Sequence, residues 1–245
     1  LDDPGRIPRL IADARALGST DLFVQVYRGG RSWFESAIAD ATPHRRVRDR
    51  SGFDALAQLL DAAHANGLRV HAWMNALSLS ENRDAAMLAR LGAEAVQVDR
   101  RGRSVLIYPD LEVPAPDRAF YRMGTRQVWL DPAAPNVAET LAALVAELVA
   151  RHPTLDGVHL DYARYPTDRF DYSRGAIRAF RDAVRPLLVG AVRREVDGLE
   201  AEDPLAYPDT FPDEWKAFRI SRLTSLVGRL RTTIKELERS EDQLA

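Results

Sequence analysis

The chain contains no cysteine, and lysine is almost as scarce. Its basic residues are 32 arginines and only two lysines, Lys216 and Lys235. The absence of cysteine excludes a disulfide framework and a thiolate metal site. Because alanine is also abundant, we interpret the excess of arginine as a bias of genomic base composition and not as the sign of an arginine-dependent function.

Long apolar runs and a strong excess of charge are also missing. No apolar run approaches the roughly 20 residues of a membrane-spanning helix, so no span is predicted. The net charge is −2 and the pI about 6.3, whereas a nucleic-acid-binding domain typically has a clustered basic face and a high pI. Net charge does not indicate a strongly ionic substrate, although a local cluster could override this. The chain begins at Leu1 and not at Met, so the sequence leaves open whether the protein has a targeting segment.

What the chain does have is an alternation of helix-like and strand-like segments. Its 245 residues, 46% of them hydrophobic, suit one large α/β domain. Helical spacing of apolar residues predicts helices over 7–17, 54–66, 81–92, 136–151, 173–197 and 213–240. Strands are predicted at 22–27, 68–75, 128–131 and 158–161, with a hairpin over 94–108. We therefore expect a single domain over 1–245, with a hairpin and loop insertion at about 94–127.

The faces of the predicted strands distinguish two architectures. Strands that alternate with helices of 10–15 residues indicate parallel βαβ units. Each strand has one aliphatic face and one polar or aromatic face, as Val158 and Leu160 oppose His159 and Asp161. A doubly wound sheet has helices on both faces and apolar central strands, whereas a barrel can be polar towards its mouth. The pattern favours a (β/α)8 barrel of the TIM type.

The predicted strands are too few for a closed barrel. Four core strands and one hairpin are predicted, whereas a barrel of this type needs eight strands. We therefore expect an incomplete (β/α)8 barrel in this chain, with the first strand and the last strands missing. Something else must then complete the sheet edges, which would otherwise be exposed.

The segment from Asp156 to Pro166 is the most informative in the sequence. It is predicted to be a short strand that ends in Asp161, followed at once by Tyr162 and Arg164. An acid at the carboxyl end of a barrel strand is typical of an active site in this fold. Tyr162 and Arg164 are candidate substrate-binding residues. The other candidates are the polar or aromatic residues that we expect to converge from the strands: Gln25, Tyr27, His71, Trp73, Asn75, Trp129, Asp131 and His159.

These residue types suit a neutral, polyhydroxylated ligand. Amides and acids hydrogen-bond hydroxyl groups and aromatic rings cover C–H faces, so a carbohydrate is the expected substrate. Taken singly, Gln25 or Asn75 could equally be an ordinary inward-facing residue that bonds its neighbours. The prediction depends on the whole set lying together on four strands.

Asp161 is the candidate catalytic residue. Hydrolysis of a glycosidic bond needs two carboxylic groups, one to protonate the leaving oxygen and one to act as nucleophile or to activate water. We assign Asp161 the role of nucleophile, with Arg164 helping to keep it ionised; the alternative is that Asp161 caps a following turn. Asp131 precedes a proline and a helix, which favours a turn or cap role. No second catalytic carboxylate stands out, and loop acids such as Asp168 and Asp171 are expected to be solvated.

Other chemistries find less support in the sequence. His71, His159, Asp131 and Asp161 are of metal-ligand types, but no His-x-His or His-Glu-x-x-His spacing occurs, so neither a metal nor a cofactor is predicted. The Gly-x-Ser-x-Gly turn of Ser–His–Asp hydrolases is absent. Residues 28–31, Arg-Gly-Gly-Arg, do not form a phosphate-binding loop and predict an exposed turn.

In these segments the chain resembles the glycosyl-hydrolase-like family ten, a bacterial group of barrels related to the α-amylase and α-galactosidase type of hydrolase. The resemblance covers nearly the whole chain. It is carried by residues 21–27, 34–36, 53–64, 67–75, 129–132 and 156–166. The run His71-Ala72-Trp73 and the segment 156–166 are specific in combination, whereas the other segments alone would be weak.

The resemblance implies a (β/α)8 hydrolase that acts on a carbohydrate. It implies that the strand ending at Asp161 is the fourth, with Asp161 in the position of the proposed nucleophile. It also implies that the first strand precedes Leu1 and that the last strands, with the general acid, follow Ala245. Members are often exported or lipid-anchored, which slightly favours the periplasm or cell surface. Most lack an established substrate, so the resemblance narrows the chemistry more than the specificity.

Two rival interpretations stay open. One is a non-catalytic carbohydrate-binding barrel with the same cleft and no working acid, and the other is a metal-dependent barrel hydrolase that acts on something other than sugars. A carbohydrate is the predicted partner, and neither nucleic acid nor a membrane span is expected. The sugar, its linkage, the stereochemical course and the oligomeric state do not follow from the sequence.

Overall fold

The computed structural model describes residues 1–104, 106 and 127–242. Four strands form one sheet in the order β2-β1-β3-β4. The strands β1 (Asp21–Arg28), β3 (Arg69–Asn75) and β4 (Gly157–Asp161) are parallel, and β2 (Arg31–Ser32) folds back antiparallel on β1. The α/β class is confirmed, and the sheet of the described residues is open rather than a closed barrel.

The helices with the clearest apolar spacing lie where the sequence predicts them. These are α1 (Ile7–Ala16), which follows the 3-10 turn η1 (Pro4–Arg6), α3 (Ala55–His64), α6 (Pro135–Arg151) and α10 (Pro212–Asp242). The shorter elements are α4 (Ala86–Leu91), η2 (Ala93–Ala95) and α9 (Ala206–Thr210). Asp54 starts α3 by accepting hydrogen bonds from the backbone N–H groups of Leu56 and Ala57.

Two helical regions differ from the prediction. The helix α2 (Thr42–Ser51) was not predicted, because it buries only His44 and Val47 and therefore shows little apolar period. The predicted helix 173–197 is divided into α7 (Arg174–Val184), η4 (Arg185–Leu187) and α8 (Gly190–Glu200). Pro186 lies at the break, since proline has no N–H to continue an α-helix and its ring clashes with the preceding turn.

The segment 128–131 does not join the parallel sheet, so its prediction as a core strand is wrong. Trp129 and Leu130 make only isolated antiparallel bridges, to Ser78 and Val96. The reason is that β3 pairs directly with β4 over five successive residues, which leaves no place for another strand between them. The predicted hairpin over 94–108 lies partly outside the described residues, which lack 105, 107 and 108; in its described part the backbone N–H of Asp99 donates to the carbonyl of Arg103, and Val96 pairs with Leu130.

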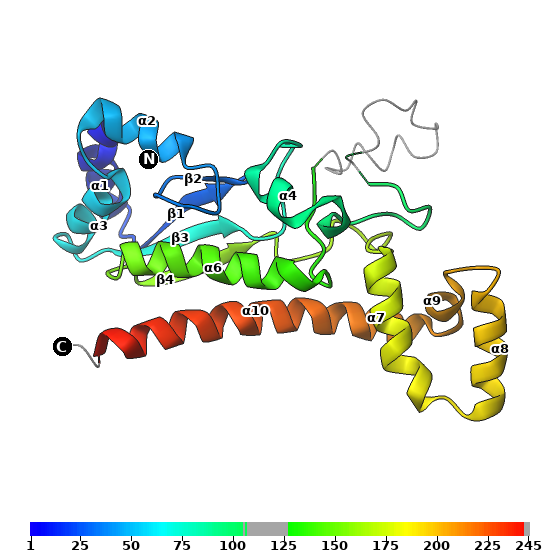
Figure 1. Ribbon diagram of the computed structural model, residues 1–245. Coiled ribbons are helices and arrows are strands. Elements are labelled where there is room, and N and C mark those ends of the chain that lie inside the picture. The colour runs from blue at the N-terminus through cyan, green and yellow to red at the C-terminus, as the bar shows by residue number, and fades with distance from the viewer. Residues whose placement is uncertain (105, 107–126, 243–245) are drawn as a thin grey trace.

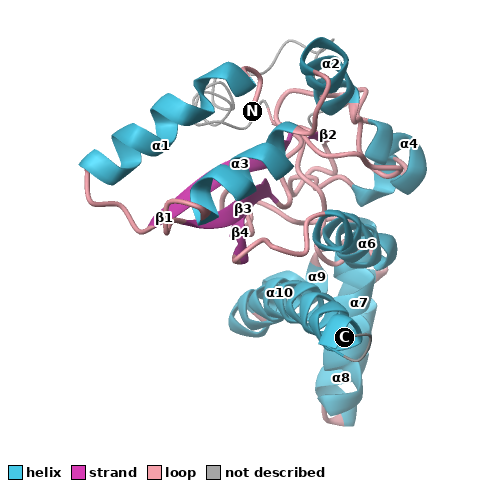
Figure 2. Ribbon diagram, turned by 90° about the vertical axis from the view of Figure 1, so that its left-hand side faces the viewer, coloured by secondary structure: helices cyan, strands magenta, loops and turns pink. Residues whose placement is uncertain are grey.

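One face of the sheet is buried beneath helices. Val70, Ala72 and Met74 alternate along β3 and are at most 2% exposed. They belong to one apolar cluster with residues of α1, α3 and α6, and Figure 2 shows α1 and α3 on one side of the strands. Burial of this apolar surface is the main stabilising term for the sheet. The opposite face carries the polar and aromatic residues, and there Phe23 is 55% exposed.

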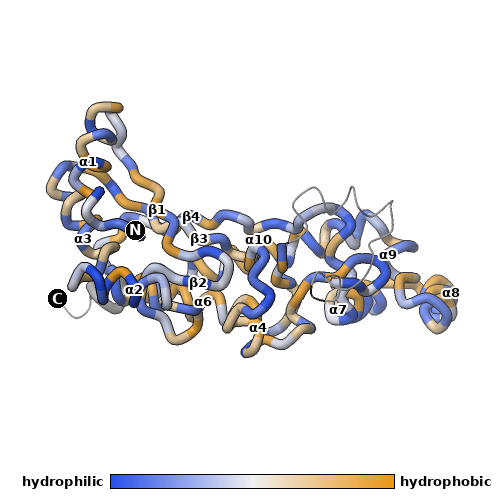
Figure 3. Tube along the Cα trace, turned by 90° about the horizontal axis from the view of Figure 1, so that it is seen from above, coloured by the Kyte–Doolittle hydropathy of each residue, from blue (hydrophilic) through white to orange (hydrophobic). Residues whose placement is uncertain are grey.

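A second apolar cluster lies apart from the sheet. It consists of Ala176, Ile177, Phe180, Val196, Tyr207 and Trp215. Figures 1 and 3 show α7, α8 and α9 at the end of the molecule opposite α1 and α3. The 31-residue helix α10 joins the two parts, because it starts in this cluster with Trp215 and buries Leu226 and Leu230 in the cluster of the sheet, beside α6. Among the described helices, α10 included, none has the length and apolarity to cross a bilayer.

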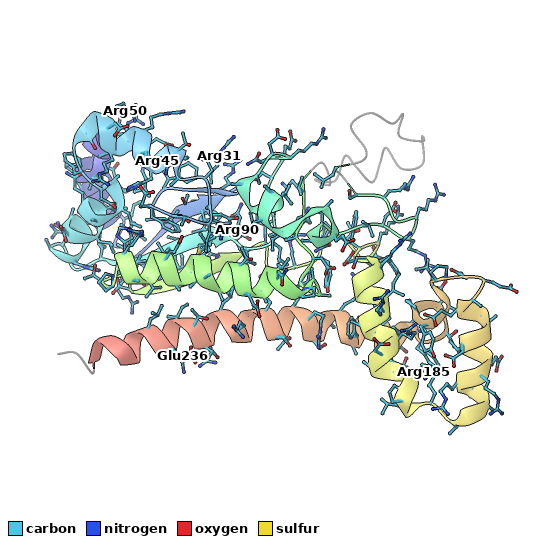
Figure 4. The ribbon with its side chains drawn as sticks, viewed as in Figure 1. Arg31, Arg45, Arg50, Arg90, Arg185 and Glu236 are labelled. Atoms are coloured by element: carbon cyan, nitrogen blue, oxygen red, sulfur yellow. The ribbon has the colours of Figure 1, made fainter. Side chains whose placement is uncertain are left out.

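Arg31 and Arg45, both labelled in Figure 4, make ion pairs with acids of the segment that follows β2. Arg45 lies 3.2 Å from Glu35, and Arg31 lies 3.7 Å from Asp40. Such exposed pairs are worth about 0–1 kcal/mol each. These pairs therefore add little to the stability of the fold.

Candidate active site

The carboxylate of Asp161 lies at the carboxyl end of β4, with both oxygens held by N–H donors. The indole Nε1–H of Trp73 donates to Oδ2 at 3.2 Å, and the backbone N–H of Tyr162 donates to Oδ1 at 2.7 Å. Tyr162 has a positive φ of 54°, an uncommon conformation that turns the chain directly after the strand. Asp161 is half-buried, so its carboxylate is fixed in orientation and still reaches the surface.

An amide pair lies beside this carboxylate. Asn75 is the register partner of Asp161 and ends β3 on the same face of the sheet. The Oδ1 of Asn75 accepts a hydrogen bond from Nε2 of Gln25 at 3.3 Å. The structure thus brings Gln25, Trp73, Asn75 and Asp161 together from three neighbouring strands. Their roles towards a ligand stay predictions.

His71 lies at the amino-terminal end of this face, apart from Asp161. In register it pairs with Gly157, the first residue of β4, whereas Asp161 is the last. Four residues of strand span about 13 Å. The Nε2 of His71 is 2.7 Å from Oδ1 of Asp21, and hydrogen bonds from Arg69, Thr20 and His71 hold the pKa of Asp21 below its usual value. The structure therefore places His71 in a charged cluster and not beside Asp161.

Phe23 and His159 form an aromatic surface between the two ends of the strands. His159 meets Phe23 and Trp73 edge-on, with ring centroids 5.2 and 6.0 Å apart. Exposed rings of this kind can cover the C–H faces of a sugar. Phe23 was not among the predicted site residues. The two-residue period of β1, which puts it on the face of Gln25, was the signal that could have found it.

Trp129, Tyr162 and Arg164 form a cluster of two tilted rings and a cation beside the end of β4. The ring centroids of Trp129 and Tyr162 are 5.4 Å apart. The guanidinium carbon of Arg164 lies 5.2 Å from the centroid of Trp129 and 5.4 Å from that of Tyr162, which are cation–π distances. Arg164 makes no ion pair with Asp161 in the described part of the chain. No direct contact therefore supports the predicted role of Arg164 in keeping Asp161 ionised.

Tyr27 lies on the opposite face of the sheet, so the prediction that it converges with the other residues is wrong. The pairing of β1 with β3 shifts between Gln25 and Tyr27, and Tyr27 pairs with Met74 on the buried face. Such a bulge inserts one residue into a strand, and the side chains after it change faces. Tyr27 is fully buried, and its hydroxyl contacts Sδ of Met87 at 3.7 Å.

Asp131 is buried at the start of α7 and not at the strand ends. Its Oδ1 accepts a hydrogen bond from the backbone N–H of Ala133 at 2.7 Å, and its Oδ2 accepts one from the hydroxyl of Ser173 at 2.8 Å. The first bond is the turn role that an Asp before Pro132 favours. With 1% of Asp131 exposed, the structure places it beyond the reach of a ligand, contrary to its prediction as a substrate-binding residue.

Asp171 is the partner of Asp131, and the expectation that Asp171 is solvated is wrong. Its Oδ1 accepts hydrogen bonds from the backbone N–H groups of Val98 and Ser173 at 3.0 and 2.9 Å. Its Oδ2 is buried and unpartnered among the described residues. Burial and the neighbouring charge of Asp131 raise the pKa of Asp171 well above its usual value. The raised pKa favours the protonated, uncharged form of Asp171.

The sequence held one signal for this buried acid pair. Ser173 precedes the amphipathic helix α7 and caps it by accepting from the backbone N–H of Ala176. Asp171, two residues before the cap, was therefore part of a helix start and not of an ordinary loop. No sequence spacing relates it to Asp131, because the two are brought together by the tertiary fold.

A metal site is not built by the described residues. Nowhere in residues 1–104, 106 and 127–242 do three side chains of the metal-binding types gather closely enough to hold an ion. In particular, His71 and His159 contact Asp21 and aromatic rings, respectively.

Known proteins resemble this chain at the levels of sequence and fold. A glycosyl hydrolase, DigH, of Escherichia coli strain K12 is 29% identical over 160 residues, which cover 63% of this chain and 34% of that protein. The α-L-fucosidase isoenzyme 2 of Paenibacillus thiaminolyticus superposes with a TM-score of 0.58 at 15% identity over 94% of this chain and 27% of that one. An α-galactosidase from Lactobacillus brevis gives a TM-score of 0.44 at 16% identity, over 93% and 24% of the two chains.

These comparisons differ in what they show. At 15% identity the fucosidase shows a common α/β fold alone, and the chain spans about a third of the length of its E. coli relative. The sequence profile described as Glycosyl hydrolase-like 10 matches residues 3–239, nearly the whole chain. The protein therefore belongs to the glycosyl hydrolase-like 10 family.

Proposed function

We propose that this chain is part of a glycoside hydrolase domain that cleaves O-glycosidic bonds of a bacterial or environmental polysaccharide, with Asp161 as the nucleophile. The observation that carries the proposal is the carboxylate of Asp161, fixed by Trp73 and Tyr162 at the carboxyl end of a parallel strand. Membership of the glycosyl hydrolase-like 10 family supports the proposal of a glycoside hydrolase function. We also propose export to the periplasm or the cell surface, which the resemblance of the sequence to a family with many exported members slightly favours.

In this proposal the sheet belongs to a (β/α)8 barrel of which residues 1–245 supply one part. Two observations support it. Within the described residues β4 pairs only with β3, so its other edge is free for a further strand. Four of the candidate residues, Gln25, Trp73, Asn75 and Asp161, also gather towards the carboxyl ends of the strands, where active sites of such barrels lie.

The proposed reaction has two steps. The carboxylate of Asp161 attacks the anomeric carbon and forms a covalent bond to the sugar, while the glycosidic C–O bond breaks and the leaving oxygen takes a proton from a general acid. Water then hydrolyses the intermediate and restores the carboxylate, with retention of configuration. We assign the acid to a later strand outside this chain, and a retaining enzyme requires it roughly 5 Å from Asp161.

The neighbours of Asp161 have distinct roles in this scheme. Trp73 orients the carboxylate through its indole N–H, and Tyr162 does so through its backbone. Gln25 offers its half-buried amide group to sugar hydroxyls, and Asn75, which is 4% exposed, orients this amide by accepting its hydrogen bond. His159 adds an exposed imidazole beside the aromatic surface.

A screen of the full-length protein against bacterial cell-wall and exopolysaccharide glycans tests the proposal. We expect Asp161→Asn to abolish release of new reducing ends. Asp168→Asn, the same change at an exposed loop acid seven residues on, should leave release intact. Turnover that survives Asp161→Asn would rule out the nucleophile assignment.

The same screen decides between the rival functions. A non-catalytic carbohydrate-binding barrel would bind a glycan, with and without Asp161→Asn, and never turn it over. A metal-dependent hydrolase would lose activity on exhaustive chelation, whereas the proposed reaction does not depend on a metal.

A further inference from the structure

Trp129 and Arg164 carry hydrogen-bond donors that the described residues leave unused. Trp129 is 4% exposed, and its buried Nε1–H finds no acceptor. Arg164 is exposed and reaches only two backbone oxygens, those of Tyr165 and Pro166, at 3.3 and 3.4 Å through one nitrogen. The Nε1–H of Trp129 is buried away from the surface, so the donors that a ligand can reach are those of Arg164.

The position of these donors links them to the candidate active site. Arg164 belongs to the loop that follows β4, three residues after Asp161. It lies at cation–π distance from the rings of Trp129 and Tyr162. Such cation–π contacts leave N–H groups of the guanidinium for an acceptor. The donors of this group therefore lie next to the residue that turns the chain after Asp161.

From this arrangement we infer that Arg164, held against Trp129 and Tyr162, binds a carboxylate group of the substrate. The guanidinium supplies donors and a positive charge and no acceptor, whereas a sugar hydroxyl both donates and accepts. A planar carboxylate matches the fork of a guanidinium in two parallel hydrogen bonds. The inference rests on the proposed function, and it specifies the glycan as an acidic one, despite the net charge of −2 of the chain.

Binding to a matched pair of ligands tests the inference without turnover. The ligands are an oligosaccharide of a uronic-acid polymer and the same oligosaccharide after reduction of its carboxyl groups to alcohols. Binding is measured by titration calorimetry on the full-length protein in its Asp161→Asn form. We expect the acidic ligand to bind about tenfold more tightly, the difference that one charge-assisted contact makes.

Substitutions then locate the effect. Arg164→Gln should abolish the preference for the acidic ligand, and Arg164→Lys should keep a part of it, because the charge stays and the fork is lost. Arg28→Gln, the same change at an exposed arginine that ends β1, is the control for general electrostatics and should leave the preference intact.

Several outcomes would overturn the inference. They are equal affinity for the two ligands, binding of neither, an equal loss with Arg28→Gln, and tighter binding of a sulfated oligosaccharide than of the carboxylated one. The proposed function fails separately. Hydrolysis that needs Asp161 but ignores the carboxyl groups refutes only the inference, and carboxylate-selective binding without hydrolysis refutes only the proposed function.

Discussion

Asp161 and Asp171 are ten residues apart and have opposite surroundings. Asp161 ends a strand on the open face of the sheet, with one N–H donor on each carboxylate oxygen. Asp171 is sealed at the start of α7, 1% exposed, with one oxygen unpartnered and a second carboxylate beside it. The first can meet a substrate and the second cannot.

The comparison shows that environment, and not residue type, assigns the role of a carboxyl group. Burial and a like charge raise the pKa of Asp171 and so favour its protonated form. A half-buried carboxylate that has a fixed orientation and still reaches the surface suits a nucleophile. The same substitution at the two positions should therefore have different effects.

The largest difference is expected when the same substitution is made at both positions. Asp161→Asn should lower kcat on a glycan substrate on the order of 10³-fold or more, because it removes the nucleophile. Asp171→Asn should keep kcat within about twofold, since the amide retains the shape and Oδ1 of the side chain. Steady-state rates of reducing-end release measure both, and a similar loss for the two variants would contradict the contrast.

The next effect concerns the other member of the acid pair. Asp131→Asn leaves only one acceptor for the two donors of Ala133 and Ser173. An unsatisfied buried donor costs about 1–3 kcal/mol, so we expect the free energy of unfolding to fall by about 2 kcal/mol. Urea denaturation measures this, with Asp171→Asn as control, in which the amide can donate to Asp131 permanently. Equal losses in the two variants would show that no proton is placed on Asp171.

The free energy of unfolding should also depend on pH through the side chain of Asp171. The pKa of Asp171 is raised by burial and by Asp131, whereas in the unfolded chain it is near 3.8. Its favourable contribution is thus fully present below pH 3.8 and is lost as the pH rises through the folded pKa. In Asp171→Asn this dependence disappears.

Urea titrations between pH 5 and 9 follow this loss. We expect the advantage of Asp171→Asn over the parent to grow with pH and then to level off. An advantage that is constant over the whole range would mean that Asp171 does not titrate there.

The smallest expected effect lies on the open face. A Cβ added at Gly157 would come 2.7 Å from Nδ1 of His71, so Gly157→Ala must displace this ring from Asp21. We expect a loss of about 1 kcal/mol in the free energy of unfolding. Gly175→Ala in α7 is the control, because its Cβ has nothing closer than 3.9 Å and alanine favours a helix. Thermal denaturation distinguishes the two variants. An equal change in Tm for both would show that the Cβ added at Gly157 does not crowd His71.

Local patterns in the sequence predicted the elements of this fold well. The apolar spacing of residues 7–17 and 213–240 corresponds to α1 and α10, and the alternation in 68–75 matches the two faces of β3. The failures have local causes too. A bulge after Gln25 moved Tyr27 to the buried face, and the charged helix α2 had almost no apolar period to detect.

The sequence by itself determined the class of the protein and the position of Asp161 at a strand end, because strand alternation and chain turns are short-range properties. Only the tertiary structure decided which side chains meet. It paired Trp73 with Asp161, laid Arg164 on Trp129, and buried Asp131 against Asp171. Contacts between residues tens of positions apart depend on register and packing, and no local pattern encodes them.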